Sequence, residues 1–108
     1  MKTYEGRREG YTVIVTVSGR PLNPRLGLWN HSPTGFEWGY GGSGPAQLAL
    51  AILADHLADD EQAFNLHHRF KWMVIAELPR RHWTLASQEI DQALQTLREL
   101  EPLLGGVT

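Results

Sequence analysis

Hydrophobic and polar residues follow two different spacings, which change near residue 43. Residues 11–17 (Tyr-Thr-Val-Ile-Val-Thr-Val) are β-branched or aromatic, the usual composition of a strand. Residues 4–7 are expected to form a partner strand, joined to the first by a hairpin turn across residues 8–10. Residues 26–29 and 36–40 are weaker candidate strands, the second with Phe36 and Trp38 on one face. The pattern therefore predicts a β-rich part over about residues 1–42.

From residue 43 to about residue 104 the spacing is helical. Residues 46–57 are rich in Ala and Leu and apolar nearly all round, which predicts a largely buried helix. Ser43 is a good N-cap for this helix, and Pro45 is tolerated in its first turn. A second helix is expected to start after Asp59 or Asp60 and to run to residue 78, where Pro79 stops it.

A third helix is expected to begin at Ser87, after a short extended link over residues 83–85, and to end at residues 105–106 (Gly-Gly). Strands followed by helices predict an α+β fold. In it a small antiparallel sheet from the N-terminal half packs against about three helices from the C-terminal half. A chain of 108 residues fits a single domain over residues 1–108. The edges of such a short sheet need covering, which favours a homodimer.

The composition excludes several classes of function. The chain has no cysteine, so it has no disulfide, no thiol nucleophile and no cysteine-ligated metal. A net charge of −2 argues against a general nucleic-acid coat protein. The first ten residues lack the apolar region of a secretory signal, and no apolar run approaches the roughly 20 residues of a membrane span. We therefore expect a cytoplasmic protein that does not contact the membrane.

A glycine-rich segment at residues 39–44 (Gly-Tyr-Gly-Gly-Ser-Gly) is the most unusual feature of the chain. It matches the G-x-G-x-x-G pattern, and its backbone could approach a phosphate at a helix N-terminus. The neighbouring elements do not predict the βαβ unit of a dinucleotide site, and Pro45 lacks an amide hydrogen. A tight turn that packs under aromatic side chains is favoured. The binding-surface candidates at this turn are Trp38, Tyr40, Ser43 and Gln47.

Histidines and basic residues offer two further hypotheses. His67 and His68 are adjacent and are expected to point about 100° apart on a helix, so we predict no metal site and no catalytic residue. No cofactor is expected. Basic and aromatic residues alternate in residues 67–72 and 79–83, a mixture that can bind nucleic acid. The candidate patch consists of Arg69, Lys71, Arg80 and Arg81, although a solvated helix face explains the same pattern.

Residues 36–53 (Phe-Glu-Trp-Gly-Tyr-Gly-Gly-Ser-Gly-Pro-Ala-Gln-Leu-Ala-Leu-Ala-Ile-Leu) resemble the signature of a family with a domain of unknown function. That family comprises small prokaryotic, plasmid and phage proteins. The similarity covers about residues 3–95 and includes residues 4–7, 70–71, 78–79, 83–85 and 90. The resemblance implies a mobile-element or accessory setting and implies no catalytic residues.

The favoured hypothesis is a non-enzymatic interaction protein of unknown molecular function that binds a protein partner around residues 38–47. The alternatives are a nucleic-acid-binding module at the basic-aromatic patch, or a nucleotide or phosphate binder at the glycine-rich turn.

Overall fold

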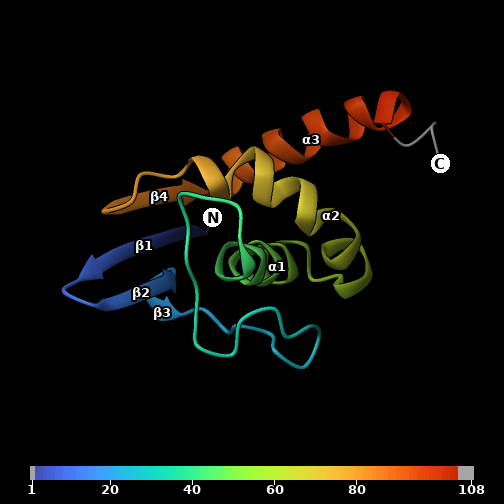
Figure 1. Ribbon diagram of the computed structural model, residues 1–108. Coiled ribbons are helices and arrows are strands. Elements are labelled where there is room, and N and C mark those ends of the chain that lie inside the picture. The colour runs from blue at the N-terminus through green and yellow to red at the C-terminus, as the bar shows by residue number, and fades with distance from the viewer. Residues whose placement is uncertain (1, 105–108) are drawn as a thin grey trace.

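The fold consists of a small sheet and three helices (Figure 1). A long irregular segment, residues 22–42, connects β3 to the first helix. The computed structural model describes residues 2–104, with side chains as far as residue 100. In chain order the elements are β1 (Thr3–Glu9), β2 (Thr12–Val17), β3 (Arg20–Pro21), α1 (Ser43–Leu57), α2 (Asp60–Met73), η1 (Ile75–Glu77), β4 (His82–Ala86) and α3 (Ser87–Leu104). The predicted α+β fold is confirmed.

The sheet is antiparallel, with the strand order β3-β2-β1-β4. Its first hairpin is confirmed, and the turn lies at Gly10 and Tyr11 because Glu9 pairs with Thr12. Residues 83–85 were predicted as a link, and this is wrong: they belong to β4, which pairs with β1. Residues 26–29 and 36–40 were predicted as candidate strands and form turns and irregular backbone instead. Within residues 2–42, strand structure is therefore confined to residues 3–21.

A close contact between strand backbone and an indole ring joins β1 to β4. Gly6 pairs with Trp83, and the Trp83 ring packs so tightly on Gly6 that a Cβ there would overlap it. The Trp83 ring in turn meets Trp38 edge-on, with ring centroids 5.6 Å apart. The irregular segment is therefore held against the sheet by an aromatic pair.

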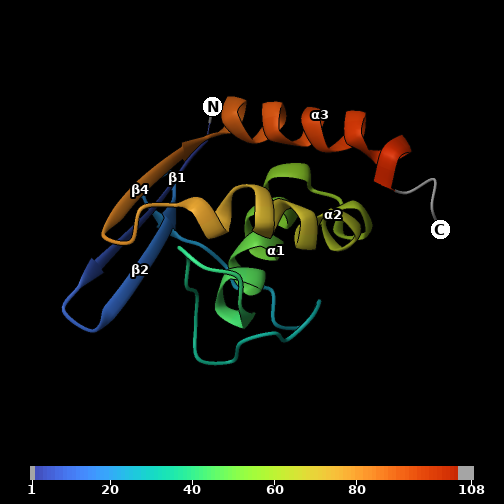
Figure 2. The same cartoon turned by 45° about the horizontal axis from the view of Figure 1, so that its top comes forward.

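The helices lie on one side of the sheet, and α2 contacts both α1 and α3 (Figures 1 and 2). Helix α1 is central, and its residues 44–54 are all buried, as the apolar pattern predicts. Its N-cap is Gly42 rather than the predicted Ser43, and no side chain caps the helix. Of the two predicted caps of α2, Asp59 and Asp60, the structure has Asp59, whose carboxylate accepts a hydrogen bond from the Gln62 amide.

Helix α2 ends at Met73, five residues before the predicted end, and the chain tightens into η1. The Ile75 carbonyl at this point accepts a hydrogen bond of 3.0 Å from the Gly39 amide. A long-range bond from the glycine-rich turn thus uses a carbonyl that a continued helix would have used internally. The predicted end of α3 at residues 105–106 lies outside the described residues.

Candidate functional site

Trp38, one of the predicted surface residues, has no exposed side chain. Its indole N–H donates to the carbonyl oxygens of Pro79 and Arg80, at 2.9 and 3.0 Å. The guanidinium of Arg8 lies 4.6 Å from the centroid of the ring. Trp38 therefore anchors the irregular segment to the loop before β4 and cannot touch a partner directly.

Gln47 on α1 is also completely buried. Its Oε1 accepts hydrogen bonds from the backbone amides of His31 and Ser32, at 2.7 and 3.1 Å. Its Nε2 donates to the carbonyl oxygens of Pro24 and Trp29, at 2.6 and 3.0 Å. Both amide hydrogens and both oxygen lone pairs are thereby used. Gln47 is an anchor for residues 24–32, with no polar atom left for a ligand.

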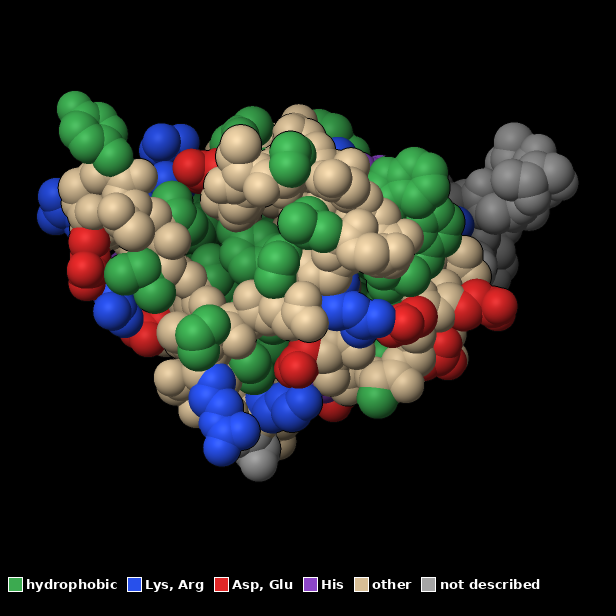
Figure 3. Space-filling view, turned by 90° about the horizontal axis from the view of Figure 1, so that it is seen from below, with side chains coloured by type: hydrophobic (Ala, Val, Ile, Leu, Met, Phe, Trp, Pro, Cys, Tyr) green, Lys and Arg blue, Asp and Glu red, His purple; other side chains and the backbone are tan. Residues whose placement is uncertain are grey.

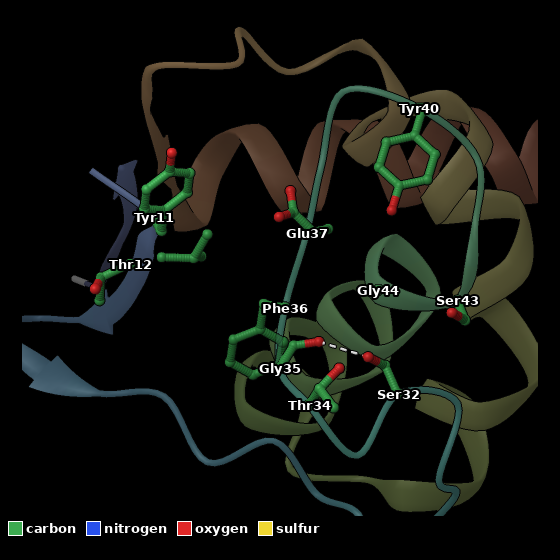
Figure 4. Close-up of a pocket in the computed structure, with 11 residues that line it drawn as sticks. Tyr11, Thr12, Ser32, Thr34, Gly35, Phe36, Glu37, Tyr40, Ser43 and Gly44 are labelled. Carbon is green, nitrogen blue, oxygen red and sulfur yellow. Dashed lines mark hydrogen bonds between the residues drawn. The ribbon is translucent and has the colours of Figure 1, made fainter. Parts of the chain in front are cut away.

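The other two candidates, Tyr40 and Ser43, are exposed and line a cleft of about 500 Å³. Figure 4 shows Tyr11 and Thr12 on the hairpin side of this cleft, and Tyr40 and Ser43 on the opposite side. Glu37 lies between the two sides. The remaining residues that line the cleft are Val13, Ser32, Thr34, Gly35, Phe36 and Gly44.

The edge of β2 is unpaired at a residue that lines this cleft. The Val15 carbonyl accepts a hydrogen bond from the Leu22 amide, so Val15 and Val13, two positions away, turn their backbone groups away from β1. Val13 lines the cleft. Within residues 2–104, its outward N–H and C=O form no backbone hydrogen bond. One N–H and one C=O are therefore available for another extended chain.

Charge in the cleft is nearly balanced. The guanidinium of Arg8 binds the Glu37 carboxylate through two hydrogen bonds, of 3.0 and 2.5 Å. These bonds hold the pKa of Glu37 below its usual range. On the face in Figure 3, hydrophobic and other uncharged side chains fill the area above the centre, and charged side chains lie along the left margin and across the lower half.

The glycine-rich turn is shaped by packing. Gly39 has a φ of +88°, which favours glycine. A Cβ on Gly41 would overlap the ring of Trp72, whose indole lies over the turn. The Ala46 amide at the start of α1 already donates to the Gly42 carbonyl. Because Pro45 has no N–H and Glu37 lies beside Gly44, the geometry offers little to a phosphate.

The predicted basic patch is divided in the structure. Arg69 and Lys71 are two positions apart on α2, about 200° around the helix. Lys71 is largely buried, with its Nζ 4.5 Å from the centroid of the Trp72 ring. Arg80 and Arg81 are exposed and, with Arg8, line a separate pocket of about 380 Å³.

Three histidine rings come together beside α2. The rings of His67 and His68 lie 4.1 Å apart between centroids, so the prediction that they diverge is wrong. Their Cα–Cβ directions differ along the helix, but the side-chain torsions bring the rings together. His31 from the irregular segment joins them, with its Nε2 2.9 Å from Nε2 of His67.

The comparison with protein families covers the whole of this arrangement. A family model, described as a family of unknown function (DUF6166), matches residues 4–96. The chain belongs to this family. The matched range includes the cleft, both anchors and the three histidines, and a family of unknown function assigns them no role. No curated protein and no solved structure gives a significant match. Within residues 2–104, no helix has both the length and the apolar character to cross a bilayer.

Residues that the sequence patterns did not single out are Tyr11, Val13 and His31. Tyr11 was placed in a strand but lies fully exposed in the hairpin turn. The signal was Gly10, whose positive φ of 64° suits a two-residue turn with glycine first. His31 carried no local signal, because Gln47 places it from 16 residues away.

Proposed function

We propose that the protein is a non-enzymatic binding protein that holds an extended segment of a protein partner in the cleft. The segment pairs with the edge of β2 at Val13 and lies between Tyr11 and Tyr40. The observation that carries this proposal is an unpaired strand edge at Val13, a residue that lines a cleft with an exposed tyrosine on each side. Addition of a strand to a sheet edge is a recurrent mode of peptide recognition.

The cleft lining supports a peptide better than a small charged ligand. Hydroxyl groups of Thr12, Thr34 and Ser43 line it, and its one charged side chain, Glu37, is paired with Arg8. Tyrosine is enriched in protein interfaces, since its ring supplies contact area and its hydroxyl a hydrogen bond. We therefore expect an uncharged partner segment that contains apolar residues.

The sequence resemblance implies a mobile-element setting, which makes the expected partner more specific. In that setting the partner is a host protein, and the small protein acts by occupying one of its extended segments. The predicted homodimer is an alternative occupant of the same edge, since two β2 edges could pair with each other.

Nucleic acid is the second candidate ligand. It is supported by the pocket in which the exposed Arg80 and Arg81 lie near the half-buried Arg8. The pairing of Arg8 with Glu37 reduces the charge available there. Salt-sensitive gel shifts that are lost in Arg80→Glu/Arg81→Glu would favour this candidate over the peptide.

The test begins by selecting peptides from a random displayed library against the immobilised protein. A selected peptide is then labelled, and its dissociation constant is measured by fluorescence anisotropy. Tyr40→Ala is expected to weaken binding by about tenfold, since tyrosine is enriched among the few residues that supply most of the binding energy of an interface. Val13→Pro removes the outward N–H without removing a bond to β1, and it should abolish binding.

The matched control is Thr84→Pro, which removes an outward N–H from β4 at the opposite edge of the sheet. Both proline variants must keep the wild-type circular dichroism spectrum. The proposal is overturned when no peptide is enriched, or when Thr84→Pro weakens binding as much as Val13→Pro. Sedimentation equilibrium distinguishes a peptide partner from a homodimer. If the wild type is a dimer and Val13→Pro is a monomer, the β2 edge is assigned to a second copy of the chain.

A further inference from the structure

The histidine cluster lies apart from the cleft lining and has a different chemistry. His67 and His68 come from α2, and His31 comes from the irregular segment. One ring nitrogen from each lies within 4.8 Å of the other two. His67 is buried, His31 is half-buried and His68 is exposed, so the cluster opens to solvent on the His68 side.

The hydrogen bonds of His67 determine which of its ring nitrogens carries a proton. Its Nδ1 lies 2.6 Å from the Phe64 carbonyl oxygen, which can only accept, so Nδ1 is the donor. The lone pair of neutral His67 is then on Nε2, which faces Nε2 of His31. Nε2 of His67 is therefore the ring nitrogen that can bind a metal ion. Burial lowers the pKa of His67 to about 4 and also lowers that of His31.

We propose that His31, His67 and His68 bind a divalent transition-metal ion, with Zn²⁺ as the expected ion. Three imidazole nitrogens with a fourth position open to solvent form a common zinc ligand set. Zn–N bonds of about 2.0–2.1 Å in a tetrahedral site place two nitrogens about 3.3 Å apart. The 2.9 Å between Nε2 of His31 and Nε2 of His67 needs only a small widening. His31 then moves its proton to Nδ1 and turns its Nε2 lone pair to the ion.

Contacts around the cluster hold the ligands in place. The Phe64 carbonyl orients His67 from the second shell, as backbone carbonyls commonly do for metal-bound histidine. The buried amide of Gln47 binds the His31 backbone N–H and fixes the approach of its loop. The ring of Trp29 lies 5.9 Å from the His31 ring and 5.6 Å from the ring of Phe64. The site is thereby partly built before an ion arrives.

Lys71 is the charged neighbour that opposes binding. Lys71 follows His67 by four positions on α2, so the two side chains lie on the same face of the helix and the ammonium charge lies near the cluster. The same charge repels a divalent cation. Removing it by Lys71→Met is therefore expected to tighten metal binding, which a purely structural histidine cluster does not predict.

The test uses the full-length chain without an affinity tag, after treatment with a chelator. Isothermal titration with ZnCl₂ is expected to show one ion per chain, and titration with MgCl₂ no binding, because Mg²⁺ prefers oxygen ligands. His68→Ala changes an exposed ligand and should leave the fold intact. It is expected to weaken Zn²⁺ binding at least about tenfold, since loss of even a second-shell partner costs about 10–100-fold.

The matched control is His82→Ala, an exposed histidine on β4 that pairs with Glu5. It should bind Zn²⁺ like the wild type. A second ligand variant, His31→Ala, should lose affinity as His68→Ala does. Absence of saturable Zn²⁺ binding, unchanged affinity in His68→Ala, or an equal loss in His82→Ala overturns the proposal.

Discussion

Trp38 and Gln47 hold two parts of the same irregular segment, residues 22–42, by opposite means. Trp38 fixes the later part with an apolar ring packed edge-on against Trp83 and one N–H between two carbonyl oxygens. Gln47 fixes the earlier part with four hydrogen bonds to backbone. Apolar burial stabilises in proportion to area, whereas each hydrogen bond adds only about 1 kcal/mol net but requires one geometry.

In each part of the irregular segment, a buried residue positions the backbone and an exposed or half-buried residue is presented to a proposed site. Trp38 positions the stretch that presents Tyr40 to the cleft. Gln47 positions the loop that presents His31 to α2. Each proposed site thus has a buried residue that places it and exposed residues that can meet a ligand. The three predictions below test this division.

Loss of the Trp38 ring should have the largest effect. Trp38→Ala leaves a cavity beside Trp83 and removes the donor to the Pro79 carbonyl, while the Arg80 carbonyl keeps its hydrogen bond from Arg8. The free energy of unfolding should fall by about 3–5 kcal/mol, measured by urea denaturation. Trp38→Phe keeps most of the apolar contact and should lose less. A loss below about 1 kcal/mol in Trp38→Ala would contradict its role as an anchor.

Lowering the pH should have the second-largest effect on the free energy of unfolding, because it protonates the buried His67. The pKa of His67 is lowered from 6.5 to about 4, mainly by burial. As the pH falls, His67 is therefore protonated in the unfolded chain before it is protonated in the folded protein. The contribution of neutral, buried His67 to the free energy of unfolding is complete above pH 6.5 and is lost as the pH falls to about 4. About 3 kcal/mol is at stake, at about 1.4 kcal/mol per pKa unit. His31, His68 and Lys71 face the same ring and add to its resistance to protonation.

The measurement is urea denaturation of the chelator-treated protein at several values between pH 4 and pH 7. In His67→Leu the fall in stability across this window should be clearly smaller than in the wild type. Glu37 provides an internal comparison, because its pKa is lowered by Arg8 and its contribution is lost only below its usual range. An equally steep fall in His67→Leu would show that other groups control the acid response.

Local patterns predicted the regular elements that carry their own signal. The strand at residues 12–17, the buried α1 and the cap at Asp59 follow from β-branched composition, Ala-Leu content and a carboxylate before a helix. Strand β4 was missed because five residues are too few to distinguish a strand from a link, and its pairing with β1 is a long-range contact.

The candidate site could be predicted only in part. Trp38 and Gln47 were singled out by their place beside the glycine-rich turn, but their burial depends on partners at residues 79–80 and 24–32. The meeting of His31 with His67 joins residues 36 positions apart and has no periodic signature. Tyr40 and Ser43 are exposed and line the cleft, and their role as binding residues stays a prediction.

Replacement of Gln47 should have the smallest effect on stability and the most specific effect on the histidines. Gln47→Met keeps the length of the side chain and removes all four hydrogen bonds. Trp29 is exposed and Pro24 and His31 are half-buried, so their freed backbone groups can bind water, whereas the amide of buried Ser32 is left without a partner. The free energy of unfolding should fall by about 2 kcal/mol. Because the loop carrying His31 is then released, Zn²⁺ affinity should also fall, whereas Trp38→Phe should leave it unchanged. Isothermal titration of the two variants decides the point, and equal Zn²⁺ affinities would show that the two anchors do not divide the segment between them.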